Sequence, residues 1–269
     1  LPCGRNVGRA DSEQALSAAY HAAGYAATTY FNPMICREYE AAWSAAAAAG
    51  VLTKHLDGTP YVYDYMGARR YTVSQVDFSH PQAPAFYGDL LQQAVDNGFD
   101  GWMEDFGEYT PLDSLSADGL PAAVEHNRYP LLYHGAAWAF QQRTKRPLLR
   151  FIRSGWTGAA RTAPVVWGGD PSTAWGFDGL ESAVKNGLTM GLSGVSLWGS
   201  DTGGYFGLTL QLSPELLQRW IQVGFASGVM RTESTGTGVV KRPQIFDADV
   251  MPNWRRYAKL RTQLYPYLA

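Results

Sequence analysis

Short apolar runs rich in aromatic and β-branched residues alternate along this chain with Ala- and Leu-rich stretches of helical periodicity. This alternation predicts successive βα units, which fold into a parallel sheet or a barrel. We expect strands over 25–31, 71–78, 98–104, 148–153, 164–167, 194–198 and 226–231, and a hairpin or loop over 55–66. Helices are expected over 12–23, 37–49, 84–97, 126–143, 179–190, 214–224 and 253–267, and Pro130 allows either a continuous helix or a break within 126–143.

The length of 269 residues suits one domain of barrel size or two small ones. A (β/α)8 barrel has eight strands, so the seven expected here predict an α/β TIM barrel without its first strand, as one domain over 1–269. The chain starts at Leu1, with neither an initiator methionine nor a signal peptide. We therefore expect the numbering to begin inside a longer polypeptide, which leaves the compartment open.

Charge and cysteine content narrow the classes of partner. The formal net charge of −2 gives no electrostatic basis for binding nucleic acid or an anionic membrane surface. No apolar run approaches the roughly 20 residues of a membrane span. Cys3 and Cys36 are too few for a disulfide scaffold and lack metal-ligand spacing. A single disulfide between them, in an oxidising compartment, stays an alternative.

Three acidic residues, Asp105, Asp170 and Asp201, each follow a predicted strand and lie among glycine and aromatic residues. The carboxyl ends of parallel barrel strands form the face that carries active sites. Any one of these residues fits a turn or a helix N-cap equally well, but three acids at three strand ends are harder to explain as separate caps. Two carboxylates converging on one sugar are the usual apparatus for cutting a glycosidic bond.

Two further polar residues end predicted strands. Arg153 closes the strand over 148–153, where a buried guanidinium needs acidic partners, and Asp105 and Asp170 are candidates. An ordinary surface arginine is the alternative. His80, which follows the strand over 71–78, is a candidate pocket-lining residue.

Other features favour structural roles. His126 and His134 lack the i, i+4 spacing of a zinc-binding helix, so both are expected to be core or surface histidines. Aromatic residues make up 13% of the chain, and composition alone favours an aromatic core over a sugar-stacking surface. The glycine-rich segments match neither a P-loop nor a dinucleotide fingerprint, and no Gly-x-Ser-x-Gly elbow stands out.

Several motifs together resemble one enzyme family. The segment 102–108, Trp-Met-Glu-Asp-Phe-Gly-Glu, resembles the nucleophile motif of glycoside hydrolase family 31, the α-glucosidase and α-xylosidase family. Its further landmarks are matched in order by Arg-Ser at 153–154, Trp-Gly-Gly-Asp at 167–170 and Ser-Asp-Thr-Gly-Gly-Tyr at 200–205. The resemblance spans nearly the whole chain. It implies a barrel cut from a longer protein, whose N-terminal β-sandwich and C-terminal β-domains lie outside residues 1–269.

The resemblance also implies a mechanism. Asp105 would be the nucleophile and Asp170 the general acid/base of a retaining double displacement, which releases a sugar from the non-reducing end of an α-glycoside. Retention predicts carboxyl groups about 5–5.5 Å apart, and no metal or organic cofactor is required. The residues expected to bind the α-linked carbohydrate are Arg153, Trp167, Asp201, Tyr205, Glu108, Trp102, Glu233 and His80.

The substrate is left generic because of one departure. Glu233 stands where family members commonly have a histidine that helps hold a sugar hydroxyl. A carboxylate accepts hydrogen bonds there instead and adds negative charge to an acid-rich pocket, which argues against simple glucose specificity. The segments 105–109, 126–127 and 230–232, with Tyr205, look most like the sulfoquinovosidase-type branch. Glu233 is unfavourable beside an anionic sugar, however.

Two other functions are open from the sequence. One is an α-transglycosidase with the same residues, in which a sugar acceptor replaces water. The other is a non-catalytic sugar-binding barrel. The presence of all the acidic residues and Arg153 argues against the second, whereas a missing strand argues for it because it leaves open sheet edges.

Overall fold

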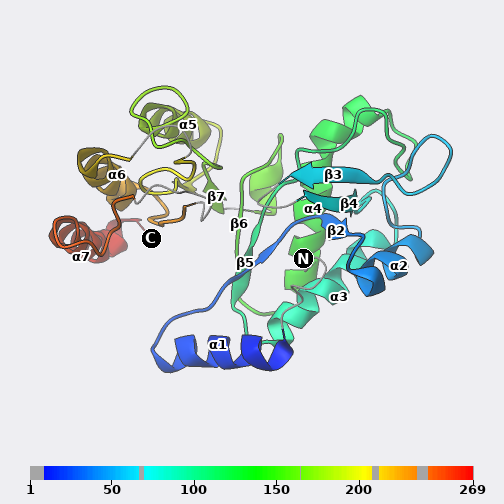
Figure 1. The fold of residues 1–269 in the computed structure, drawn as a ribbon, viewed down its shortest axis with the longest axis horizontal. Coiled ribbons are helices and arrows are strands. Elements are labelled where there is room, and N and C mark those ends of the chain that lie inside the picture. The colour runs from blue at the N-terminus through cyan, green and yellow to red at the C-terminus, as the bar shows by residue number, and fades with distance from the viewer. Residues whose placement is uncertain (1–8, 67–69, 164, 208–211, 235–241, 269) are drawn as a thin grey trace. The chain divides into compact units, whose positions relative to one another are not determined.

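The computed structural model describes residues 9–66, 70–163, 165–207, 212–234 and 242–268. The chain divides into two units, residues 1–163 and 164–269. Figure 1 shows the course of the chain through both.

Three parallel strands form the centre of the first unit. β5 (Gly101–Glu104) lies between β1 (Thr29–Phe31) and β6 (Leu149–Ile152). Phe31 is level with Glu104, and Glu104 with Ile152, so the three strands end together. This confirms the strands expected over 25–31, 98–104 and 148–153, and it places the residues that follow them at one edge of the sheet.

Helices α1 (Ala10–Ala22), α3 (Ala83–Asp96) and α4 (Ala122–Thr144) belong to the same unit, and α3 packs on α4. Of the two alternatives at Pro130 the helix is continuous, because α4 continues through this buried proline. Aromatic side chains fill the space beneath the strands. Phe31, Trp102, Tyr87, Phe78 and Tyr133 belong to one buried cluster and meet mostly edge to face.

A second, antiparallel sheet corrects the expected strand pattern. β4 (Arg70–Gln75) lies between β2 (Met34–Cys36) and β3 (Tyr63–Met66), so the run expected over 71–78 is not a parallel barrel strand. β2 begins directly after Asn32-Pro33, and its three residues are too few to show a period of two. Figure 1 shows this sheet at the end of the first unit away from α1, beside α2 (Glu40–Ala48).

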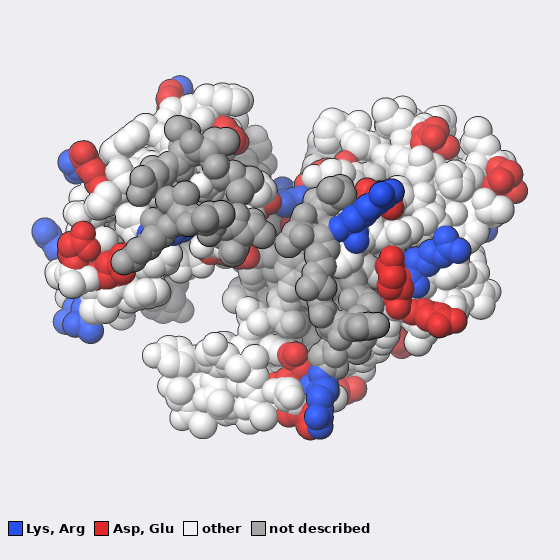
Figure 2. Space-filling model, viewed as in Figure 1, with Lys and Arg blue, Asp and Glu red and all other residues white. Residues whose placement is uncertain are grey.

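The structure also bears on the cysteines, the surface charge and the membrane-span expectation. Cys36 is disulfide-bonded, which agrees with the disulfide alternative; Cys3, the other cysteine, lies outside the described residues. On the face of the first unit seen in Figure 2, acidic and basic side chains are interspersed. None of the described helices is both long and apolar enough to cross a membrane.

Glu125, in the first turns of α4, is a buried carboxyl with a raised pKa. Its side chain is 1% exposed and lies 3.2 Å from the Arg128 guanidinium. Burial raises its pKa from 4.5 to about 7, although Arg128 opposes the shift. Between pH 4.5 and about 7, the Glu125 carboxyl therefore keeps its proton in the folded protein but has lost it in the unfolded chain. The contribution of Glu125 to stability falls as pH rises through this window, by up to about 3 kcal/mol.

We accordingly expect Glu125→Gln to raise the free energy of unfolding at pH 8 and to flatten its decline between pH 5 and 8. Urea unfolding at several pH values measures both. Glu215→Gln is the matched control, because Glu215 is exposed on a helix and pairs across one helical turn with Arg219. A Glu125→Gln protein less stable than wild type at pH 8 would mean that the Arg128 ion pair outweighs the cost of burial.

The second unit contains a parallel pair, β7 (Val165–Trp167) and β8 (Leu197–Gly199), with helices α5 (Leu180–Leu192), α6 (Pro214–Ala226) and α7 (Met251–Leu268). α6 begins at Ser213, whose hydroxyl oxygen accepts the Leu216 amide at 3.1 Å. α7 packs on α6, and the Arg261 guanidinium donates to the carbonyl of Phe225 in the last turn of α6 and to that of Gly228 just after the helix.

The strand expected over 226–231 is wrong in its extent. Residue 226 still belongs to α6, and the following segment pairs with β8 only through the Val229 amide and with Asp201 through one isolated parallel bridge at Arg231. The segment still runs beside β8. The backbone of Gly228 lies so close to Leu197 that there is no room for a Cβ atom at this position. The apolar run was recognised, but its ladder is too short to form a strand.

Candidate active site

Asp105 is the first residue after β5, and its backbone is fixed on both sides. Its amide donates to the Phe31 carbonyl at 2.9 Å, which extends the pairing with β1. The chain then turns sharply, since Phe106 has a φ of 62° and Gly107 a φ of 109°. A positive φ is uncommon for a residue with a side chain. This turn directs the Phe106 amide back onto Asp105 Oδ1 at 2.8 Å.

Three donors meet the Asp105 carboxylate. Besides the Phe106 amide, Tyr30 Oη donates to Oδ2 at 2.5 Å, and Arg153 Nη1 lies 3.1 Å from Oδ1. Desolvation, followed by the negative charge of Asp105, raises the pKa of Tyr30 well above its usual value, so its hydroxyl remains a donor at all physiological pH values. The side chain of Asp105 is buried among these groups. It is a fixed, charge-compensated carboxylate at a strand end.

Arg153 joins two of the predicted site residues. Besides its contact with Asp105, its Nε and Nη2 atoms each lie 2.8 Å from Glu108 Oε1, and its guanidinium stacks 4.5 Å from the centre of the Phe106 ring. The side chain is only 12% exposed, so the surface-arginine alternative is wrong. β6 ends one residue earlier, which brings Arg153 level with the residue after β5.

Beneath this edge lies a buried polar cluster that the sequence analysis missed. Glu104 is fully buried, and its Oε1 accepts Trp102 Nε1 and lies beside Arg150 Nε, both at 3.0 Å. His134, on α4, meets Glu104 Oε2 through Nδ1 at 2.7 Å. No spacing rule links these residues, because 30 positions separate Glu104 and His134.

Trp102 corrects a predicted role. Its side chain is 0% exposed and packs edge to face on Phe31, while its indole N–H is used inside the protein by Glu104. The structure therefore places Trp102 in the core below the edge rather than on a surface where a sugar would bind. His134 is a core histidine, as expected, but a hydrogen-bonded one.

In the second unit, Asp170 follows β7 after two glycines. The Gly168 amide continues the pairing with β8 by donating to the Gly199 carbonyl at 2.8 Å. Gly169 has a φ of 71°, a conformation that favours glycine, and Asp170 itself is half-buried. Trp167 is buried, and Arg231 lies over its ring at 5.6 Å.

Arg231 brings two more predicted residues together. Its Nη1 lies 3.2 Å from Oδ1 of the buried Asp201, and its Nη2 pairs with Glu233. The Thr202 amide also donates to the Arg231 carbonyl at 3.0 Å. Glu233 therefore has a counter-ion, which the sequence analysis did not consider when it counted this residue as added negative charge.

Tyr205 lies in a loop held by a residue that the sequence analysis did not single out. Its amide donates to the Pro171 carbonyl at 2.7 Å, so the loop is attached next to Asp170. Arg242 donates to the carbonyls of Gly203, Gly204 and Tyr205 at 3.2, 2.8 and 3.4 Å. Burial lowers the pKa of Arg242, against the opposing charge of Asp201. The 37 positions between Arg242 and Tyr205 hide this link from sequence reading.

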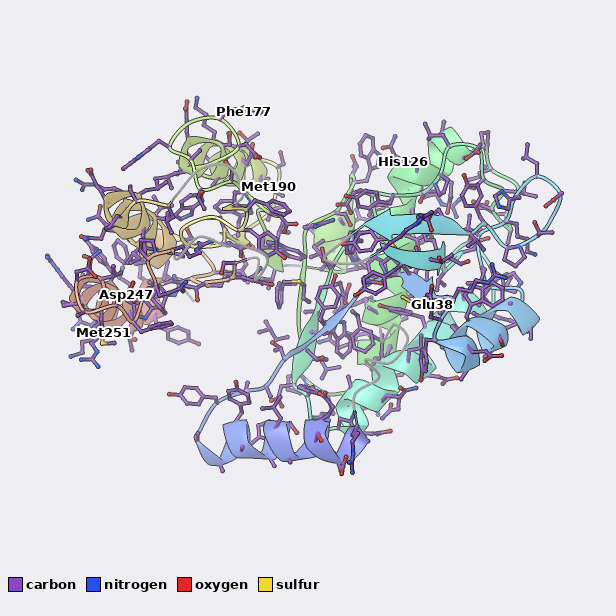
Figure 3. The ribbon with its side chains drawn as sticks, in the orientation of Figure 1. Glu38, His126, Phe177, Met190, Asp247 and Met251 are labelled. Atoms are coloured by element: carbon purple, nitrogen blue, oxygen red, sulfur yellow. The ribbon has the colours of Figure 1, made fainter. Side chains whose placement is uncertain are left out.

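The other two histidines that were singled out from the sequence, His80 and His126, lie elsewhere. His80 precedes α3, where Nδ1 accepts the Gln82 amide at 3.3 Å and Nε2 faces Gly50. These contacts do not join it to Asp105. His126, labelled in Figure 3 near the start of α4, contacts the Thr110 carbonyl through Nδ1 at 2.9 Å. Within the described ranges, no group of three or more histidine, cysteine or acidic residues is arranged to hold a metal ion.

Comparison with known proteins identifies the family of the chain. The family model described as the glycosyl hydrolases family 31 TIM-barrel domain matches residues 9–269. A sulfoquinovosidase of Agrobacterium fabrum is 32% identical over 246 residues, and one of Escherichia coli 30% over 244; both alignments cover 89% of this chain. An α-xylosidase of Emericella nidulans is 32% identical over 81% of this chain. The chain spans 35%, 36% and 27% of the Escherichia, Agrobacterium and Emericella proteins.

A solved structure gives the same result. The family 31 sulfoquinovosidase from E. rectale, in complex with an aza-sugar inhibitor, matches with a TM-score of 0.86 and 28% identity over 94% of this chain and 38% of its own. The predicted α/β TIM-barrel class is thereby confirmed. The fold, the order of the motifs and the extent of the match together identify this chain as a member of glycoside hydrolase family 31, a family of glycosidases, within its TIM-barrel domain.

Proposed function

We propose that this chain carries the catalytic residues of a retaining α-glycoside hydrolase. Asp105 is the nucleophile, and the observation that carries this assignment is the arrangement of three donors around its carboxylate. Donors from Tyr30, Arg153 and the Phe106 amide compensate its negative charge and fix its orientation, as attack on an anomeric carbon requires. Asp170, which follows β7, is assigned as the general acid/base.

The reaction has two displacements. One oxygen of Asp105 attacks the anomeric carbon while Asp170 donates its proton to the departing glycosidic oxygen, which leaves a covalent glycosyl-enzyme. Asp170, now a carboxylate, takes a proton from water, and the hydroxide oxygen replaces Asp105 at the same carbon. Two inversions return the sugar with its α configuration. Asp105 ends ionised and Asp170 protonated, so the residues are regenerated.

The proposed substrate is the non-reducing end of an α-glycoside. Trp167, Asp201, Glu233 and Tyr205 are assigned to the sugar that is released. Because Arg231 pairs with both Asp201 and Glu233, these carboxylates are oriented as acceptors for sugar hydroxyls without a net excess of two charges. The sulfoquinovosidases and the α-xylosidase among the relatives support both a sulfonated and a neutral sugar as candidates.

Transglycosylation by the same residues is the second candidate. The loop after Asp170 exposes two aromatic side chains: Trp175 is half-exposed, and Phe177, labelled in Figure 3, is 92% exposed. Apolar sugar faces stack on such rings, so the loop offers a platform for an acceptor sugar in place of water.

A panel of p-nitrophenyl α-glycosides, given to the full-length protein, tests both candidates. The panel contains the glucoside, xyloside, galactoside and sulfoquinovoside, and NMR follows the anomer that is first released. We expect release from one glycoside with the α anomer formed first. A β anomer as first product would contradict the double displacement. A longer glycoside formed in the presence of added acceptor sugar would select transglycosylation, and no release from any member would favour a sugar-binding barrel.

A further inference from the structure

Glu104 and Asp105 are consecutive carboxylates with separate environments. Asp105 lies among the donors at the strand end, whereas Glu104 is fully buried and held by Trp102 and Arg150. Successive side chains of a strand point to opposite faces, so the two carboxylates share one backbone but different partners. Any group that fixes Glu104 therefore also fixes the backbone from which Asp105 extends.

His134 is the group that connects Glu104 to the other residues of the edge. Its Nδ1 lies 2.7 Å from Glu104 Oε2, and its Nε2 lies 3.2 Å from both the carbonyl oxygen and Oγ of Ser154. Ser154 follows Arg153, and its hydroxyl donates to the Phe106 carbonyl at 2.6 Å. One imidazole thus links the residue before Asp105 to the residue after Arg153.

The turn that aims Asp105 depends on this link. Phe106 has a φ of 62°, a conformation that a residue with a side chain adopts only when its surroundings hold it there. The Ser154 hydroxyl holds the Phe106 carbonyl from one side. Gly107 is pressed against Ser154 as well, because a Cβ there would lie 2.5 Å from Ser154 Oγ.

Proton counting assigns a charge to the His134 ring. Ser154 has one hydroxyl proton, and it goes to the Phe106 carbonyl, which can only accept. Both Ser154 oxygens near Nε2 are then acceptors, as is the Glu104 carboxylate at Nδ1. Both ring nitrogens therefore donate, and the ring is an imidazolium.

The charges of the surrounding groups agree with that assignment. The carboxylates facing this region from β5 and its following loop are Glu104, Asp105 and Glu108, and the guanidinium groups are Arg150 on β6 and Arg153 directly after it. Tyr133, beside the ring on α4, remains neutral because burial raises its pKa. A cationic His134 brings these three carboxylates and three cations to neutrality.

We propose that His134, as an imidazolium, is a positioning residue that holds Asp105 and Arg153 in their catalytic geometry through Glu104 and Ser154. This inference rests on the proposed function of Asp105. His134 touches no reacting atom; it acts through the backbone of Phe106 and through the positive charge that it places behind the nucleophile.

The test uses His134→Asn and His134→Gln in the full-length protein. The asparagine amide takes the place of Nδ1 and keeps the bond to Glu104, whereas the glutamine amide takes the place of Nε2 and keeps the bond to Ser154. Both remove the charge. We expect kcat to fall about 10- to 100-fold, more for the asparagine variant, with KM within about threefold of wild type. The acidic limb of the kcat/KM profile should move up by about one pH unit in both variants.

Two further variants complete the test. Ser154→Ala removes the link to Phe106 with little change in volume and should lower kcat without moving the acidic limb, so it carries the test where a His134 variant fails to fold. His21→Gln is the matched control, because His21 pairs with Asp100 at 2.7 Å at the other end of β5 and is exposed. Folded His134 variants with wild-type kcat and an unmoved acidic limb would overturn the proposal.

A failure of the proposed function is distinguishable from this outcome. A wild-type protein that releases no sugar refutes the function and, with it, the catalytic role of His134. In that case a double-mutant cycle of His134→Asn, which removes the contact with Ser154, and Ser154→Ala on unfolding stability still tests the link. Coupled effects would support the bridge between β5 and β6, and additive effects would overturn it.

Discussion

Asp105→Asn is expected to lower kcat for the released sugar by at least about 1,000-fold while the protein stays folded and still binds sugar. The amide has nearly the shape of the carboxylate: its oxygen can still accept the Phe106 amide, and its NH2 group, in the place of Oδ2, can donate to the Tyr30 hydroxyl oxygen. It has neither the charge nor the nucleophilicity to form the glycosyl-enzyme. Turnover of the best substrate of the panel, together with sugar affinity by calorimetry, measures the two effects separately.

Asp170→Asn distinguishes the two carboxylates by their dependence on the leaving group. Without a general acid, a poor leaving group such as an alkyl alcohol should lose about 100- to 10,000-fold in rate, whereas p-nitrophenolate needs little protonation and should lose much less in the first step. Asp105→Asn should slow both substrates alike. Equal losses for Asp170→Asn on both substrates would show that Asp170 is not the acid, and full activity of Asp105→Asn would refute the nucleophile.

Gly101→Ala is expected to prevent folding. At Gly101 the φ is 153°, and a Cβ would lie 1.8 Å from the Leu149 carbonyl oxygen and 2.6 Å from its carbon. These are backbone atoms of the neighbouring strand, paired with Gly101 in the sheet, so β5 and β6 would have to separate. The cost exceeds the roughly 4–5 kcal/mol that marks an exceptional substitution, against a typical total stability of about 5–15 kcal/mol.

Soluble yield, circular dichroism and thermal unfolding measure this effect. Gly135→Ala is the control with the opposite sign, since Gly135 is inside α4 and a Cβ there meets no atom within 4 Å. Alanine in a helix interior is favoured by up to about 1 kcal/mol over glycine. A Gly101→Ala protein that melts near the wild-type temperature would mean that the sheet tolerates an opening at this position.

The strand ends were the part of the site most readable from sequence. Asp105 and Arg153 could be assigned to one sheet edge because each follows an apolar run, and parallel strands end together. Trp102 belongs to the same motif as Asp105, yet the side chain of Trp102 is buried in the core. Successive side chains of a strand alternate between its two faces, so residues of one motif can have different environments. A motif gives the order of residues but not the side of the strand that each one occupies.

The remaining contacts of the site and fold could not be predicted because they join residues far apart in the sequence. His134 and Arg242 act on residues 30 and 37 positions away, through partners that no short spacing indicates. The antiparallel sheet was not predicted for a similar reason. β2 has only three residues, and a whole helix separates it in sequence from its neighbour β4. Such contacts depend on how elements meet in space, and hydrophobic periodicity contains no record of that.

The three donors around Asp105 belong to other residues: a phenol, a guanidinium and a backbone amide. Removal of the carboxylate leaves them in place, so the strand end is a receptor for small anions, of which the Asp105 side chain is only the covalently attached occupant. Formate, azide or fluoride has the size and charge to take its position. The same scaffold could thus serve as a glycosynthase, in which a supplied or departing anion replaces the carboxylate and glycosidic bonds accumulate instead of being cut.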